Sequence, residues 1–339
     1  MKDEKLPLRV GAINWDASLP AETYFGGYAV RNLSTPEFCD RLPFFAQKLP
    51  DGTYRIPVRS QADYDRELTY AIEGGIDFFV FCWYPDDDRP RTFGTERYDY
   101  LAEYYHELNT ARKLYQSSAL NRQIGMCAIV FSIHAYSEND LEELFDAMRQ
   151  DYYEKIDGRP LVVIYNLYDE AFIRELRERA AEKGLELYVA CIHASKAEPR
   201  PDFAQADAVT CYAVGGSGED FAALNANARN LNRERLHFGP KVIPIMSAGW
   251  NPMPRVKQPC PWVGYGSGPY AGRPTDTDLE EAFCQTRAFI EENPDKADTG
   301  LAFIFAWNEF EEGGYLCPTL AADGSADDTA LRAFEKAKK

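Results

Sequence analysis

The sequence predicts an α/β protein, a single (β/α)8 TIM barrel over residues 1–339 with long loops after strands 1 and 7. Three observations support this class. Apolar, strand-like segments alternate with helical segments along the chain, which indicates a parallel sheet. We count about eight such units, the number that closes a barrel. Neither a GxGxxG after the first strand nor a P-loop motif occurs in the sequence, which disfavours an open, nucleotide-binding sheet.

Each expected strand is an apolar run of strand length, and each expected helix carries apolar residues at helical spacing. The first long helix begins with a capping sequence at 60–63 and stops at Gly74–Gly75. The expected strands cover 8–14, 76–84, 124–131, 161–165, 187–192, 207–212, 241–246 and 301–307. The expected helices cover 60–73, 98–120, 138–149, 170–183, 221–236, 278–292 and 329–338. Two long segments, 17–57 and 247–273, show no clear period, and we expect the first to cap one end of the fold.

The last expected strand leads into a group of carboxylates. Residues 301–307 are apolar or aromatic without a charge, which suits a strand buried on both faces. Asn308 follows directly, and three carboxylates come next: Glu309, Glu311 and Glu312. Gly313–Gly314 then let the backbone turn sharply. Two interpretations fit this segment: an acid and a base at the mouth of a barrel, or an acidic helix start favoured by the helix dipole.

The composition narrows the possible partners. The chain has 339 residues, of which 45% are hydrophobic, and this is enough for a sizeable core. Its formal net charge of -17 repels phosphates, so nucleic acid and anionic membranes are disfavoured. No apolar run approaches the roughly 20 residues that span a membrane. Aromatic residues make up 14% of the chain, and Tyr and Trp can fill a core or line a site for a ring-bearing ligand such as carbohydrate.

The cysteines predict buried thiols. Four of the eight lie inside apolar, strand-like runs: Cys82, Cys127, Cys191 and Cys211. That placement suits free thiols better than a disulfide framework. No CxxC or clustered Cys/His spacing occurs, so we expect no metal and no cofactor. No signal-peptide pattern precedes Leu6, so we expect a cytoplasmic protein; a periplasmic or secreted protein whose signal had been removed would look the same.

The carboxyl ends of the strands predict the site, because barrel enzymes carry their active residues there. Polar and aromatic residues follow almost every expected strand, which suits a cleft that hydrogen-bonds hydroxyls and stacks on sugar faces. Any one of them could also be an ordinary structural residue. The candidate substrate-binding residues are Asn14, Trp15, Asp16, Trp83, Tyr84, His134, Tyr165, Tyr212, Trp250, Asn308 and Tyr315.

Glu309 and Glu312 are the candidate catalytic pair. Glycoside hydrolysis needs one carboxyl group that is protonated and another that is ionised. Residues at i and i+3 of a helical turn have Cβ atoms about 5–6 Å apart, so both can face one cleft. Two close carboxylates also split their pKa values, because ionising one disfavours ionising the other. We expect Glu311 to point elsewhere, toward solvent.

These residues carry a family resemblance. The segment WNEFEEGGYLCP at 307–318 resembles the WNEWxEGxxxEP signature of glycoside hydrolase family 99 and of the related WbsX-like proteins. The resemblance departs at Phe310, Glu311 and Cys317, where the family commonly has Trp, His or Ala, and Glu; these departures bear on the identity of the substrate. Weaker pieces follow the family's order, and the resemblance covers most of the chain: GIDFFVFCWY at 75–84, KIDGRPLVVIY at 155–165 and IPIMSAGW at 243–250.

The resemblance implies a (β/α)8 barrel and a retaining, endo-acting enzyme on α-mannosides. In that family the first Glu of the signature is a base that assists attack by the sugar's own 2-hydroxyl. The second is the general acid and later the base for water. Carried over, these are Glu309 and Glu312. The expected function is a retaining glycoside hydrolase that acts on α-mannoside-like or related linkages of an oligosaccharide or polysaccharide.

Two alternatives stay open. WbsX-like proteins are often described as polysaccharide-biosynthesis proteins, so glycosyl transfer, or carbohydrate binding without hydrolysis, is one. A metal-dependent barrel hydrolase using Asp16, His134 and His193 is the other. Such enzymes usually carry HxH after the first strand, where this chain has Asn14-Trp15-Asp16, and no HExxH occurs in the sequence.

Overall fold

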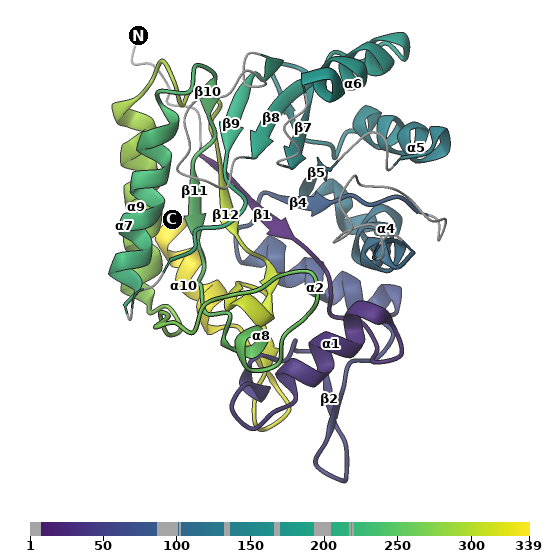
Figure 1. Ribbon diagram of the computed structural model, residues 1–339, viewed down its shortest axis with the longest axis vertical. Coiled ribbons are helices and arrows are strands. Elements are labelled where there is room, and N and C mark those ends of the chain that lie inside the picture. Colours follow the sequence, from purple (N-terminus) through teal and green to yellow (C-terminus); the bar gives the residue numbers. More distant parts are fainter. Residues whose placement is uncertain are drawn as a thin grey trace.

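The computed structural model describes residues 8–86, 101, 103–131, 136–165, 170–192, 205–216, 218 and 220–339. Within these ranges, nine strands form one curled parallel sheet with helices packed on its outer side (Figure 1). Neighbouring strands follow the order β10-β9-β8-β7-β5-β4-β1-β12-β11. The strands are β1 (Arg9–Asn14), β4 (Phe78–Cys82), β5 (Gly125–Val130), β7 (Arg159–Tyr165), β8 (Tyr188–Ile192), β9 (Ala208–Thr210), β10 (Lys241–Val242), β11 (Ile245–Ser247) and β12 (Leu301–Phe305).

The two ends of this sheet are consecutive pieces of one segment. β10 pairs with β9, β11 pairs with β12, and Ile243 and Pro244 separate the two pieces. The Ile243 N–H donates to the Val209 carbonyl at 3.0 Å, and the Pro244 carbonyl accepts from the Phe303 N–H at 2.9 Å. One short segment therefore hydrogen-bonds to β9 on one side of the sheet and to β12 on the other. This is consistent with a TIM-like barrel.

The strands supply a core that is apolar on both faces. Every residue of β4 and of β12 is buried, as expected for parallel strands covered on both sides. Gly11 in β1 shows how closely the strands pack, because a Cβ at this position would lie 2.1 Å from the Phe78 ring. The four cysteines Cys82, Cys127, Cys191 and Cys211 are buried free thiols, which confirms the prediction from their apolar surroundings.

The helices follow the expected alternation. α2, α5 and α9 each begin with a capping box, in which a Ser or Thr exchanges hydrogen bonds with an Asp three residues later. The expected helices at 138–149 and 329–338 are confirmed as α5 and α10. No helix among the described residues is long and apolar enough to cross a membrane. The helices are α1 (Tyr24–Leu33), α2 (Gln61–Glu73), α4 (Thr110–Ser117), α5 (Glu138–Arg149), α6 (Glu170–Glu182), α7 (Phe221–Arg235), α8 (Met253–Lys257), α9 (Asp276–Glu292) and α10 (Thr329–Lys338).

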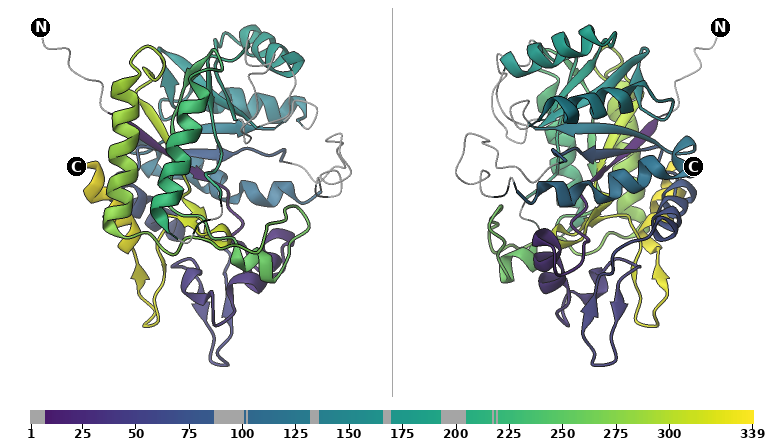
Figure 2. Two further views of the ribbon diagram at one scale, coloured as in Figure 1. Left: turned by 60° about the vertical axis from the view of Figure 1, so that its left-hand side comes forward. Right: turned by 90° about the vertical axis from the view of Figure 1, so that its right-hand side faces the viewer.

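The two long segments are more ordered than their sequence suggests. The segment after β1 contains α1 and a hairpin of β2 (Gln47–Lys48) and β3 (Tyr54–Arg55), and the segment after β11 contains α8. Gly26 and Gly27 interrupt the helical spacing of apolar residues in α1, so the sequence does not indicate this helix. Gly26 is nevertheless required, since a Cβ there would lie 2.2 Å from the Pro20 carbonyl oxygen. α1, α8 and the β2–β3 hairpin all lie at one end of the molecule (Figures 1 and 2).

Two further elements differ from their predictions. The expected helix over 98–120 falls partly outside the described residues, and the rest is broken into a 3-10 helix (Tyr105–Asn109), α4 and a second 3-10 helix (Ala119–Arg122). A short antiparallel strand, β6 (Lys155–Ile156), precedes β7. Asp157 and Gly158 join the two strands with φ values of 51° and 78°, the left-handed backbone that Asp-Gly hairpins adopt.

Candidate active site

A cavity of about 490 Å³ lies where the strands finish, within the size range of small-molecule sites. Its wall comes from residues at or shortly after the carboxyl ends of β1, β4, β5, β7, β9 and β12, from the two long segments and from Tyr105. Seven of the sequence-predicted residues line it: Trp15, Tyr84, Tyr165, Tyr212, Trp250, Glu309 and Glu312. The cavity therefore gathers residues that are far apart in the sequence, as the carboxyl-end rule for parallel barrels predicts.

Glu309 and Glu312 sit on one tight turn. Asn308–Glu309 form β13, Phe310–Glu312 form a single 3-10 turn, and Gly314–Tyr315 return as β14, antiparallel to β13. Both side chains line the cavity, Glu309 from just before the 3-10 turn and Glu312 from its last residue. Gly313 closes the turn with φ 74°, and a Cβ on it would lie 2.8 Å from the Asn251 backbone nitrogen.

The Glu309 carboxyl group is nearly enclosed. Its Oε1 accepts a hydrogen bond from the Tyr212 hydroxyl at 2.9 Å. Among the described residues its Oε2 has no hydrogen-bond partner. Burial raises the pKa of Glu309 well above its ordinary value, and the neighbouring Glu312 raises it further, against a smaller lowering by Arg255 and Tyr212.

The Glu312 carboxyl group has two strong donors. Arg255 and the Tyr265 hydroxyl both donate to its Oε1. Burial raises the pKa of Glu312, whereas Arg255 and Tyr265 favour the ionised form and lower it. Hydrogen bonding and charge therefore favour ionisation of Glu312 over ionisation of Glu309.

The prediction that Glu311 points to solvent is wrong. Glu311 is 3% exposed, because α1 and α8 cover the turn that carries it. Its Oε1 accepts from the Asn32 side-chain amide of α1 at 2.6 Å, and its Oε2 accepts from Arg255 of α8 at 3.2 Å. Burial alone would lower the pKa of Arg255, but Glu311, Glu312 and Glu309 together raise it.

A row of aromatic rings leads along the cavity wall to Glu309. Tyr84 stacks between Tyr105 and Phe131, with ring centroids 4.7 and 4.8 Å apart. Phe131 then contacts Tyr165 at 5.0 Å, and Tyr165 contacts Tyr212 at 5.5 Å. Since Tyr212 bonds Glu309, the row connects apolar ring surface with the carboxyl pair. Such a wall offers both stacking surface and hydroxyl groups to a sugar.

Five of the predicted substrate-binding residues do not line the cavity: Asn14, Asp16, Trp83, Asn308 and Tyr315. Asn308 accepts from the Trp15 backbone N–H and donates to the Asn14 side chain, both at 3.0 Å. Asn14 and Asn308 thus hold the cavity wall from behind. Asp16 is ion-paired with Arg59 and is also buried.

Trp83 and Tyr315 also lie away from the cavity. Trp83 is fully buried, and the Arg112 guanidinium of α4 lies 3.8 Å from the centre of its ring. Tyr315 lines a separate pocket of about 60 Å³, where its hydroxyl accepts from Arg273 Nε at 2.9 Å. That pocket is too small for a sugar ring.

The two histidines of the metal-dependent alternative, His134 and His193, lie outside the described residues. Asp16, the third residue of that alternative, is turned toward Arg59 and away from the cavity. In the described part of the chain, no group of three His, Cys, Asp or Glu side chains is placed to hold a metal ion. The Arg255 guanidinium lies within ion-pair distance of Glu309, Glu311 and Glu312.

Several cavity residues were missed from the sequence. The carboxyl-end rule selects only residues that directly follow an expected strand. Arg255, Trp262 and Tyr265 instead belong to the long segment after β11. Its density of Trp and Tyr was a signal, but nothing in the sequence distinguishes Arg255 from other arginines. The missed lining residues with large side chains are Phe25, Tyr105, Phe131, Arg255, Trp262 and Tyr265.

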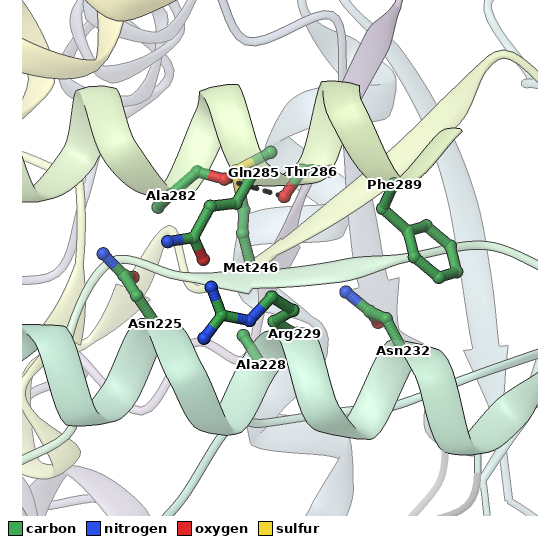
Figure 3. A pocket seen from close by; sticks show the side chains of 9 residues that line it. All are labelled: Asn225, Ala228, Arg229, Asn232, Met246, Ala282, Gln285, Thr286 and Phe289. Atoms are coloured by element: carbon green, nitrogen blue, oxygen red, sulfur yellow. Dashed lines mark hydrogen bonds between the residues drawn. The ribbon is translucent and has the colours of Figure 1, made fainter. Parts of the chain in front are cut away.

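A further pocket lies between the adjacent helices α7 and α9 (Figure 3). Asn225, Arg229 and Gln285 reach into it from the two helices. Its volume of about 10 Å³ is close to the minimum for one water molecule, so it offers no room for an organic ligand.

The fold and the cavity define a TIM-like barrel with a buried carboxyl pair at the carboxyl ends of its strands. Two solved structures of the glycoside hydrolase family 99 endo-α-mannosidase from Bacteroides thetaiotaomicron share this fold. One has a TM-score of 0.52 at 15% sequence identity over 82% of this chain and 79% of that chain. The other, in complex with bis-tris-propane, has a TM-score of 0.56 at 15% identity over 97% and 95%. No family model and no curated protein matches the chain.

Proposed function

We propose that this protein is a glycoside hydrolase, with Glu309 and Glu312 as its catalytic pair in a single catalytic (β/α)8 barrel domain. The observation that carries the proposal is the tight 308–315 turn, which directs both carboxyl groups into one aromatic-lined cavity. Two carboxyl groups of divided protonation are what glycoside hydrolysis needs. The aromatic row and the hydroxyls of Tyr84, Tyr165 and Tyr212 suit a sugar better than a charged or purely apolar ligand.

The roles of the two carboxyl groups follow the resemblance to family 99. Glu309 removes the proton of the sugar's 2-hydroxyl, whose oxygen attacks the anomeric carbon while Glu312 protonates the leaving oxygen. Glu312 then takes a proton from water, whose oxygen opens the anhydro-sugar, and Glu309 returns its proton to the 2-oxygen. The configuration at the anomeric carbon is retained. The unpartnered Glu309 Oε2 supports the first role, since it can accept from a ligand hydroxyl.

The acid role of Glu312 requires that its proton be present when substrate is bound. Burial already raises its pKa, and Arg255 and Tyr265 oppose this. Bound sugar favours the protonated form of Glu312 when the sugar's 2-hydroxyl donates to Glu309 Oε2, because that bond stabilises the ionised form of Glu309, whose negative charge then raises the pKa of the neighbouring Glu312. α-Mannoside-like linkages are the proposed substrates, on the strength of the resemblance and of the fold shared with an endo-α-mannosidase.

The test uses the purified protein and Glu312→Gln on a panel of α-mannan fragments and mixed bacterial and host glycans. Release of oligosaccharide by the wild type alone supports hydrolysis and identifies the substrate class. Glu312→Gln should lose activity on glycans with poor leaving groups and retain it on activated aryl glycosides, which need no acid. Full activity of Glu312→Gln on natural glycans would refute its role. Binding without turnover by the wild type would favour the alternative of a carbohydrate-binding or glycosyl-transferring protein.

A further inference from the structure

Three buried residues from three separate elements meet beside the proposed catalytic pair. Asn32 comes from α1, Glu311 from the 3-10 turn and Arg255 from α8. Asn32 donates to Glu311 at 2.6 Å, and Glu311 accepts from Arg255 Nη2 at 3.2 Å. The Arg255 guanidinium also lies 5.2 Å from the centre of the Trp15 ring and 5.8 Å from that of Trp262. The orientation of Arg255 is therefore constrained from several sides.

Glu311 and Glu309 approach the same nitrogen of Arg255. Nη2 lies 3.2 Å from Glu311 Oε2 but 3.8 Å from Glu309 Oε2. The first distance is a hydrogen bond and the second is too long for one. The other terminal nitrogen, Nη1, is bonded to Glu312. Glu309 Oε2 is consequently left without a hydrogen-bond partner among the described residues, although a guanidinium stands beside it.

We infer that Glu311, anchored by Asn32, is a positioning residue that holds Arg255 on Glu312 and away from Glu309, which leaves one Glu309 oxygen for a ligand hydroxyl. This inference rests on the proposed function for its catalytic meaning, but its geometry does not depend on turnover. A buried carboxylate is costly unless it is paired and hydrogen-bonded. Here both oxygens of Glu311 are hydrogen-bonded, and one of these bonds occupies the Arg255 nitrogen nearest to Glu309.

The consequence is electrostatic. If an Arg255 nitrogen were bonded to Glu309, it would stabilise the carboxylate form of Glu309, lower its pKa and weaken it as a base. Because Glu311 holds that nitrogen instead, burial remains the largest influence on the pKa of Glu309. Glu311 also adds negative charge, which raises the pKa of Glu309 directly. Among the described residues, the titratable and charged groups that face Glu309 are Cys82 from β4, Tyr212 after β9, Arg255 from α8, Tyr265 from the long segment after β11, and Glu311 and Glu312 from its own turn.

Removing the charge of Glu311 tests the inference. Glu311→Gln frees Arg255 Nη2 to bond Glu309, so the pKa of Glu309 should fall by about one unit or more. The measurement is a ¹³C NMR titration of protein labelled at the glutamate side-chain carboxyl carbon, with the Glu309 signal assigned by its loss in Glu309→Gln. Glu311→Asp keeps the charge and should stay closer to the wild type. Asn32→Ala loosens Glu311 and should move the midpoint in the same direction by less.

Glu73→Gln is the matched control. It makes the same change of net charge on the surface, where Glu73 pairs with Arg332 at 3.2 Å, and should leave the Glu309 midpoint unchanged. A folded Glu311→Gln protein whose Glu309 midpoint equals or exceeds that of the wild type would overturn the inference. If Glu311→Gln does not fold, Asn32→Ala decides by the same criterion.

The titration needs no substrate, so it tests this inference even if the protein shows no turnover. Absence of turnover would contradict only the proposed function. If the protein does hydrolyse glycans, kcat/KM offers a second readout. The limb of its pH profile that reports Glu309 should shift to lower pH in Glu311→Gln, in step with the NMR midpoint. A purely structural role of Glu311 would lower activity without moving that limb.

Discussion

Arg255→Leu is expected to be the most destabilising change in the cluster of Arg255, Glu309, Glu311 and Glu312 at neutral pH. It removes the guanidinium that contacts Glu309, Glu311 and Glu312 and leaves buried carboxyl groups without their counter-charge. Breaking a buried ion pair by removing one partner costs about 3–5 kcal/mol. We expect a loss of that size in the free energy of unfolding at pH 7.5, measured by urea denaturation.

The cost should shrink on acidification, and the sign follows from the pKa shifts. Glu309 and Glu312 have pKa values raised in the folded protein above the unfolded value of about 4.3. At pH values between the unfolded pKa and the raised folded pKa, the folded protein binds more protons than the unfolded chain. The free energy of unfolding therefore increases as the pH falls through this range and decreases as the pH rises through it. Without Arg255 both pKa values rise further, so Arg255→Leu should gain more stability than the wild type between pH 7.5 and pH 5.

Lys257→Leu serves as the control for this prediction. Lys257 lies on the same helix as Arg255, but it is 47% exposed and pairs with the exposed Glu37, so its loss should cost less than about 1 kcal/mol. If Arg255→Leu costs no more stability than Lys257→Leu at pH 7.5, Arg255 is not the counter-charge that the buried carboxyl groups need. A cost of several kcal/mol that is the same at pH 5 would refute its electrostatic origin.

Three smaller changes test other parts of the molecule. Tyr212→Phe removes the hydrogen bond to Glu309 and should lower kcat by about tenfold to hundredfold and stability by about 1–3 kcal/mol, because a buried acceptor loses its donor; an unchanged kcat would contradict its place in the site. Gly11→Ala places a Cβ against the Phe78 ring and should lower stability by about 1–3 kcal/mol, whereas Gly264→Ala, with no atom within 4 Å of the added Cβ, should not. Thr275→Ala removes the cap of α9 and should cost about 1 kcal/mol, seen as a lower urea midpoint.

The sequence was most informative where local chemistry and periodicity agree. The apolar runs of β4 and β12 identify buried parallel strands, and the Ser60–Asp63 sequence marks the start of α2. The carboxyl-end rule led to Trp15, Tyr84, Tyr165, Tyr212 and Trp250, all of which line the cavity. It failed for Trp83, since a residue next to a strand end can point either into the barrel or outward, and one residue of register changes the side.

The sequence by itself determined the class of fold and the tight turn that carries Glu309 and Glu312, because both depend on neighbours along the chain. Only the tertiary structure decided which groups surround that turn. Asn32 and Arg255 lie on long segments whose path depends on packing against the whole barrel, and no local pattern encodes their meeting at Glu311. Glu311 is therefore buried in spite of its charge, because two distant hydrogen-bond donors reach it.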